Sequence, residues 1–135
     1  MNAVQQQLRI PSVPENIRVV EQFIEELKEK LHIKDDIYGN IMIAVTESVN
    51  NAIIHGNKSD HKKLVDLSMK IDDKKISFSI KDEGAGFNYN DLPDPTAPEN
   101  LLAPGGRGIF IIKHLADEVE FLSHGSQINL TFYLT

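Results

Sequence analysis

Apolar residues recur at helical spacing in the first part of the chain. Between residues 17 and 31 they fall three or four positions apart, and charged residues occupy the positions between them. The pattern predicts an amphipathic helix that ends near His32. Ser12 is a candidate N-cap, Pro14 suits the first turn, and Glu15 follows at the spacing of a capping box.

A second helix is predicted after Lys34. Asp35 and Asp36 suit its start, where the helix dipole favours negative charge, and Gly56 is a suitable C-terminal stop. Its apolar stripe consists of Ile37, Ile41, Ala44, Val45, Ser48 and Ala52.

Elsewhere the apolar positions alternate with polar ones, which is the period of a strand. Turn sequences at 72–74 and 124–126 predict two hairpins, and an apolar segment from Gly108 to about Ala116 predicts a third helix. The predicted strands are residues 6–10 as an edge strand, 65–71, 76–80, 119–121 and 128–134.

These elements predict an α+β fold. One mixed, mostly antiparallel sheet covered on one face by three helices makes a two-layer α/β sandwich that buries its apolar face. The length favours a single domain over residues 1–135. Residues 88–104 contain four prolines, so we expect a mobile loop there.

Composition excludes several classes of function. The formal net charge of −6 argues against direct nucleic-acid binding, which needs a basic face. There is no cysteine, hence no disulfide and no thiolate site. No apolar run has the length of a membrane span, and the N-terminus does not read as a signal peptide. We therefore expect a cytoplasmic protein.

The segment from Glu47 to Asn57 carries polar groups on an otherwise apolar helix. Glu47, Asn51 and His55 are four residues apart and share one face, with Asn50 on its flank. One carboxylate beside carboxamide oxygens suits Mg²⁺ and a polarised hydroxyl or water. For His55 the sequence favours a structural role at the helix end over a catalytic one.

The segment D-E-G-A-G-F begins where a strand is predicted to end. Asp82 could accept a hydrogen bond from an exocyclic amine such as that of adenine, and Gly84 and Gly86 would let the backbone approach a flat ligand. An ordinary glycine turn explains the segment equally well when it is taken alone.

The segment G-G-R-G-I-F opens the third helix. Free backbone N–H groups at a helix start bind anions, so Gly105, Gly106 and Gly108 suit phosphate, and Arg107 adds positive charge. A hinge before a core helix is the alternative. The segment is neither a Walker A loop, which requires Gly-Lys-Ser/Thr, nor a dinucleotide fingerprint, which requires a βαβ unit.

Taken together, the three segments resemble the GHKL ATPases. E-S-V-N-N-A-I-I-H-G-N at 47–57, D-E-G-A-G-F at 82–87 and G-G-R-G-I-F-I-I at 105–112 occur in the order found in that superfamily. The sequence of the first segment and the small size of the chain resemble those of one branch of the superfamily, the RsbW-like anti-sigma-factor serine/threonine kinases. The resemblance covers residues 5–134.

This resemblance implies ATP and Mg²⁺ as cofactors. Asn51 would hold the Mg²⁺ that bridges the phosphates, with Asn50 nearby, and Glu47 would be the general base. The γ-phosphate would go to a serine of an anti-anti-sigma-type partner, and the kinase would otherwise sequester a sigma factor. A homodimer is compatible with these patterns.

The resemblance also assigns the base and phosphate contacts. Asp82 would read the adenine amine, and Gly84 and Gly86 would form the floor of the base pocket. Residues 88–107 would form a lid, and contact of Arg107 with the γ-phosphate is our own inference. The phosphates would be wrapped by Gly105, Gly106 and Gly108.

Two other functions remain as alternatives. The chain could be a non-catalytic ATP-binding module that regulates a partner by binding alone, but the presence of both Glu47 and Asn51 favours an enzyme. A histidine kinase catalytic domain is disfavoured, because no helix pair with a phospho-accepting histidine precedes the domain in this sequence.

Overall fold

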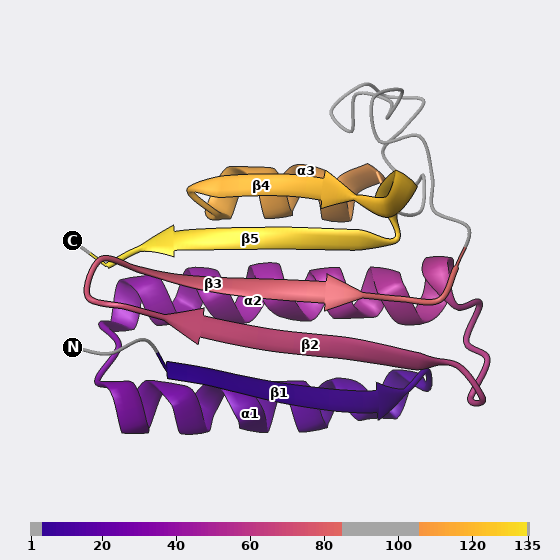
Figure 1. The fold of residues 1–135 in the computed structure, drawn as a ribbon, viewed down its shortest axis with the longest axis horizontal. Helices are drawn as coiled ribbons and strands as arrows, with labels where there is room; N and C mark the ends of the chain where they lie inside the picture. The colour runs from indigo at the N-terminus through magenta and orange to yellow at the C-terminus, as the bar shows by residue number, and fades with distance from the viewer. Residues whose placement is uncertain (1–3, 85–105, 135) are drawn as a thin grey trace.

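The fold is a five-stranded sheet with helices on one face (Figure 1). The structure is a computed structural model that describes residues 4–84 and 106–134, and for residues 106 and 107 it describes the backbone alone. The strand order is β1-β2-β3-β5-β4, and all four pairings are antiparallel. The α+β two-layer prediction is confirmed, with an antiparallel rather than a mixed sheet. The strands are β1 (Val4–Pro11), β2 (Leu64–Ile71), β3 (Lys75–Lys81), β4 (Glu118–Leu122) and β5 (Gln127–Tyr133).

The three helices cover the same face of the sheet (Figure 1). Helix α1 (Ile17–Leu31) lies behind the edge strand β1, α2 (Asp35–Asn51) lies behind the middle of the sheet, and α3 (Gly106–Leu115) lies behind the other edge strand, β4. Among the described residues, no helix is long and apolar enough to cross a bilayer.

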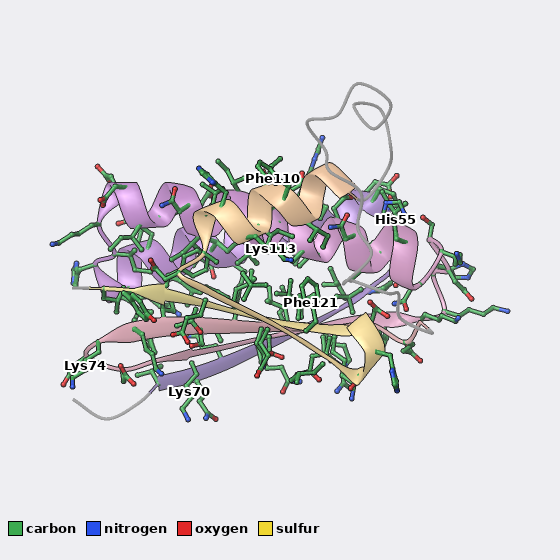
Figure 2. All side chains as sticks on the ribbon, turned by 90° about the horizontal axis from the view of Figure 1, so that it is seen from above. His55, Lys70, Lys74, Phe110, Lys113 and Phe121 are labelled. Carbon is green, nitrogen blue, oxygen red and sulfur yellow. The ribbon has the colours of Figure 1, made fainter. Side chains whose placement is uncertain are left out.

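The core lies between these two layers, where alternate strand residues meet the helix stripes. Phe78 and Phe132, from neighbouring strands, pack edge to face with ring centroids 6.2 Å apart. Figure 2 shows Phe121 between the helix layer and the sheet, whereas Lys70 points away from the helices. The side chains buried from α2 are Ile41, Ala44, Val45, Ser48 and Val49.

The other face of the sheet is open and polar. It forms a shallow concavity of about 860 Å³, lined mainly by neutral amide and hydroxyl side chains together with Lys70, Glu118 and Glu120. The neutral polar side chains are Gln5, Gln6, Gln7, Ser68, Ser77, Ser79, Gln127, Asn129 and Thr131.

The prediction of Ser12 as a helix N-cap is wrong. A short 3₁₀ turn, Pro14–Asn16, precedes α1, and Val13 flanks it without any side-chain capping bond. Ser12 is fully buried instead, and its hydroxyl donates to the carbonyl of Lys63 at 2.7 Å. The buried hydroxyl is thus paired with groups far away in sequence, in keeping with the rule that buried polar groups are hydrogen-bonded.

The helix α2 continues into a wider π-helical turn, Ala52–Gly56. The backbone N–H of Asn57 closes this turn by donating to the carbonyl of Ala52 at 2.8 Å. Lys58 and Ser59 then have left-handed φ values of 56° and 55°. Single π-helical turns are rare and occur frequently at functional sites. Gly56 ends the helix as predicted.

We expect Gly39→Ala to stabilise the protein. Gly39 lies inside α2, and a methyl group added there would meet nothing within 4 Å. Alanine should raise the free energy of unfolding by about 0.5–1 kcal/mol, because it restricts the unfolded chain and favours the helix. Urea denaturation measures this. Gly84→Ala should have the opposite effect, because its added Cβ would lie 2.2 Å from the carbonyl oxygen of Gly56. Equal stability of the two variants would contradict this account.

Candidate functional site

The start of α3 packs directly against two of the predicted site residues on α2. A Cβ added to Gly108 would lie 2.9 Å from Glu47 Oε2 and 3.1 Å from Asn51 Nδ2. Both side chains are only partly exposed, and α2 and α3 are in extensive contact. A larger residue would displace these side-chain ends, so with glycine the carboxylate and the carboxamide can face the helix start, at which free N–H groups attract anions. The first and third sequence segments therefore meet in space.

Asn51 is the one residue in the described part of the chain that has a buried side-chain polar atom without a hydrogen-bond partner, its Nδ2. Leaving a buried amide unsatisfied costs about 1–3 kcal/mol, so it requires an explanation. A bound phosphate oxygen would satisfy the N–H₂ group. Rotation of the amide by 180° would instead present its oxygen to a cation.

The donor set agrees with a cation that reaches the site together with its ligand. Within residues 4–84 and 108–134, no three histidine or acidic side chains gather in a group that could hold a metal ion. Mg²⁺ is commonly bound by one or two protein oxygens together with substrate phosphates and waters, so a single amide beside a phosphate suits it. Asn51 and the start of α3 fit that arrangement.

The described start of the second segment, Asp82–Gly84, forms a turn in which all three backbone N–H groups are hydrogen-bonded. Asp82 N–H donates to the carbonyl of Ser126 at 2.9 Å, and Gly84 N–H donates to Asp82 Oδ1 at 2.7 Å. The N–H of Glu83, between them, donates to Oδ1 of Asn57 at 2.7 Å. Within the described residues, the bond from Gly84 goes to Oδ1 of Asp82, and Oδ2 is the other oxygen of the carboxylate.

Two glycines confine the carboxylate of Asp82. A Cβ added to Gly56 would lie 2.3 Å from Asp82 Oδ2, and one added to Gly84 would collide with the Gly56 carbonyl. The turn after β3 and the π-helical turn after α2 are therefore in close backbone contact. Gly56 acts not only as a helix stop but also as the neighbour that makes room for Asp82.

Partial burial raises the pKa of the Asp82 carboxyl above its ordinary value. The hydrogen bond from the Gly84 N–H and the positive charge of Lys63 act in the opposite direction but do not cancel the effect of burial. A carboxylate that is desolvated and only partly satisfied is typical of functional sites.

The structure describes some predicted site residues only in part. Asn50 is half-buried on α2, and His55 is exposed on the π-helical turn (Figure 2). Gly106 and Arg107 belong to the backbone of α3. Gly86, Gly105 and the expected loop at 88–104 lie outside the described residues.

Sequence reasoning missed Asn57. This residue is fully buried, and its side chain links four segments of the chain, including the turn at Glu83. The one signal that could have revealed it is the position of an asparagine directly after a helix-ending glycine, where a side-chain amide often satisfies backbone groups.

We expect Asp82→Asn to stabilise the ligand-free protein at neutral pH. Because the folded-state pKa is raised, the contribution of Asp82 to stability is present below its unfolded pKa, about 3.8, and is lost as pH rises through the folded pKa. Asparagine carries no charge and still accepts the bond from Gly84. As pH rises from the unfolded pKa of Asp82 to its folded pKa, the difference in unfolding free energy between variant and wild type should therefore grow. Above the folded pKa it should stay constant.

Thermal unfolding across this pH range measures the effect. Asp36→Asn is the matched control, because it removes one negative charge from the exposed first turn of α2, where the helix dipole favours that charge. A stability gain from Asp36→Asn as large as that from Asp82→Asn would show that net charge, not burial of Asp82, is the cause.

Comparison with known proteins identifies the family of this chain. Residues 10–132 match the family model described as "Histidine kinase-like ATPase domain". An anti-sigma F factor of Bacillus cytotoxicus is 37% identical over 102 residues, which are 70% of this chain and 68% of that protein. Anti-sigma F factors of Bacillus cereus and Bacillus thuringiensis match to the same extent.

A solved structure has the same fold. The crystal structure of the RsbU and RsbW domains of a Mycobacterium tuberculosis protein superposes with a TM-score of 0.67. The match covers 96% of this chain and 32% of that chain, at 16% identity, so it supports the fold alone. The family model and the sequence relatives go further: the chain belongs to the histidine kinase-like ATPase domain family and is similar within it to the anti-sigma F factors.

Proposed function

We propose that this protein is an ATP-dependent serine/threonine protein kinase of the anti-sigma-factor type. It would phosphorylate a serine of an anti-anti-sigma-type partner and sequester a sigma factor. One observation carries most of the weight: Gly108 holds the start of α3 against Glu47 and the unsatisfied amide of Asn51. The family supports ATP as the ligand, and the relatives named anti-sigma F factors support the class of partner.

The described residues divide the work of binding. Asp82 Oδ2 would accept the adenine amine, and Gly84 would let the base approach the turn. Asn51 would hold Mg²⁺, with Asn50 beside it, and the backbone at Gly108 would face the phosphates. Bound ATP and Mg²⁺ supply the phosphoryl group and offset its negative charge.

Glu47 would act as the general base. Its carboxylate would accept the proton of the partner's serine hydroxyl as the serine oxygen forms a bond to the γ-phosphorus and the bond to the β–γ bridging oxygen breaks, releasing ADP. Glu47 is partly exposed, and its Oε2 lies beside Gly108 at the start of α3, which supports this role.

The remaining expectations belong to this proposal. Residues 1–135 would form one domain with a lid at 88–107, and Arg107 would contact the γ-phosphate. The phosphates would also be wrapped by Gly105 and Gly106, and Gly86 would complete the base pocket. We expect a cytoplasmic location, and the kinase is compatible with a homodimer.

Nucleotide binding should be selective for adenine and should depend on Mg²⁺. In Asp82→Asn an N–H₂ group replaces Oδ2 and opposes the adenine amine, so ATP binding should weaken by about 1.5–3 kcal/mol, the range for a hydrogen bond to a charged group. Titration calorimetry with ATP and GTP measures the base selectivity of the wild type and the loss of ATP affinity in Asp82→Asn. Wild type that binds GTP as tightly as ATP, or an unchanged ATP affinity in Asp82→Asn, would refute the assignment.

Glu47→Ala should separate chemistry from binding. A positioned base contributes about 10²–10⁴-fold in rate, so phosphotransfer should fall by about that factor while ATP and partner affinity change little. Single-turnover transfer from labelled ATP to a co-encoded anti-anti-sigma-type protein, with a pull-down in parallel, measures both quantities. If wild type binds the partner without any transfer, the chain is a non-catalytic module. Undiminished transfer in Glu47→Ala would remove the base assignment alone.

A further inference from the structure

The side-chain amide of Asn57, near the proposed site, is fully hydrogen-bonded. It is fully buried, directly after the π-helical turn. Its Nδ2 donates to Ser12 Oγ at 2.8 Å and to the carbonyl of Leu64 at 3.1 Å, and its Oδ1 accepts from the N–H of Glu83 at 2.7 Å. A buried amide with both donor hydrogens and its oxygen engaged has one orientation, because any rotation would leave buried groups unpaired.

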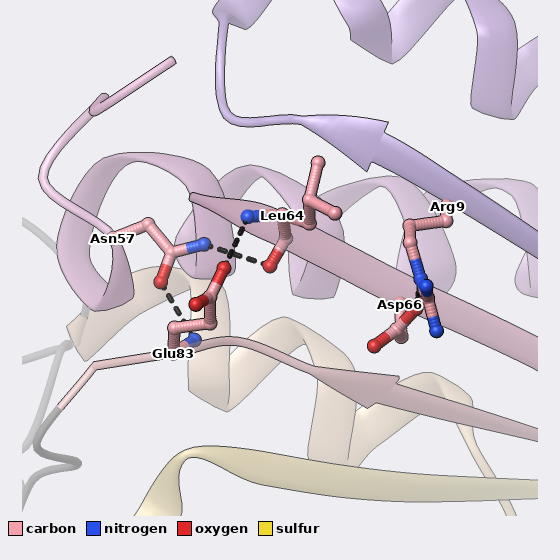
Figure 3. Close-up of polar contacts among 5 residues, drawn as sticks. All are labelled: Arg9, Asn57, Leu64, Asp66 and Glu83. Carbon is pink, nitrogen blue, oxygen red and sulfur yellow. Dashed lines mark hydrogen bonds and ion pairs between the residues drawn. The ribbon is translucent and has the colours of Figure 1, made fainter. Parts of the chain in front are cut away.

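Three residues close a ring of hydrogen bonds, which Figure 3 shows. Asn57 Nδ2 donates to the Leu64 carbonyl, the Leu64 N–H donates to Glu83 Oε2 at 2.5 Å, and the Glu83 N–H returns to Asn57 Oδ1. The ring joins the end of the α2 segment, the first residue of β2 and the turn after β3. It fixes Glu83 from both its backbone and its side chain.

The ring controls the middle of the turn that carries Asp82. The flanking N–H groups are held by the Ser126 carbonyl, from the neighbouring strand segment, and by the Asp82 side chain itself. Only the N–H of Glu83 is held by a side chain from the helix layer. Without that bond the turn would be tied to the sheet but not to the π-helical turn after α2, whose Gly56 lies against the Asp82 carboxylate.

We infer that Asn57 is a positioning residue for base recognition, an inference that rests on the proposed nucleotide site. Asn57 does not contact the base. It holds the Asp82–Gly84 turn against the end of α2, so that Asp82 Oδ2 points to one fixed place. Loss of this bond should reduce discrimination between adenine and guanine more than it reduces phosphate binding, because Asn51 lies in α2 and Gly108 lies in α3, outside the turn that Asn57 holds.

The test compares Asn57→Ala with Ser12→Ala. Both remove buried hydrogen bonds of the same network, but Ser12→Ala leaves the Glu83 N–H bonded to Asn57. We expect the ratio of ATP to GTP affinity to fall about ten-fold in Asn57→Ala, equivalent to about 1.4 kcal/mol, and to stay near wild type in Ser12→Ala. Asn57→Asp retains the oxygen that accepts from Glu83, so it should preserve the ratio even where it lowers stability.

Two further measurements keep the test decisive. Amide exchange by NMR should show faster exchange at Glu83 and Gly84 in Asn57→Ala but not in Ser12→Ala, and it requires no nucleotide. If Asn57→Ala does not fold, Glu83→Pro removes the same N–H group at an exposed residue and should also lower the ratio.

The outcomes separate the two claims. Wild type that does not discriminate between ATP and GTP overturns the proposed site, while the exchange data still decide whether Asn57 holds the turn. Wild type that does discriminate, together with equal ratios and equal exchange in Asn57→Ala and Ser12→Ala, overturns the positioning role. In that case Asn57 contributes to stability alone.

Discussion

Burial of one face of α2 against the sheet is the constraint on which the rest of the structure depends. Ile41, Ala44, Val45 and Val49 are fully excluded from solvent, and this fixes the rotation of the helix about its axis. With that rotation, Glu47 and Asn51 point toward α3. The π-helical turn that follows places Gly56 beside Asp82, at the end of β3. The apolar stripe thus determines where every polar group of the candidate site can be.

The cost of the site appears in the two groups that this packing leaves incompletely satisfied. Asn51 keeps a buried amide nitrogen without a partner, and Asp82 carries a carboxyl whose pKa is raised by burial. Neither arrangement would be selected for stability in the absence of a ligand. Asn51 ends α2 and Asp82 follows β3, and in the proposed site both would gain partners from the same nucleotide.

The sequence predicted the periodic elements well and the contacts that break periodicity poorly. The stripe of α2, both hairpins and the edge position of β1 follow from spacing alone, because burial of an apolar face imposes a period of 3.6 or 2. Ser12 was assigned to a helix cap, since local rules see only neighbours in sequence, whereas its partners lie 45 and 51 residues away. The role of Asn57 was missed for the same reason. The juxtaposition of Gly108 with Glu47 and Asn51 required the tertiary fold.

The antiparallel register also places the chain ends and the candidate site at opposite ends of the sheet. Val4 pairs with Ile71, and Lys75 pairs with Tyr133, so the first and last described strand residues share one end of the sheet (Figure 1). Leu64, Asp82 and Gln127 lie at or beyond the opposite end. A reporter or a second module joined to either terminus would therefore project away from the candidate site. A domain of the same fold is part of a larger chain in the mycobacterial structure, so this arrangement is compatible with a longer polypeptide.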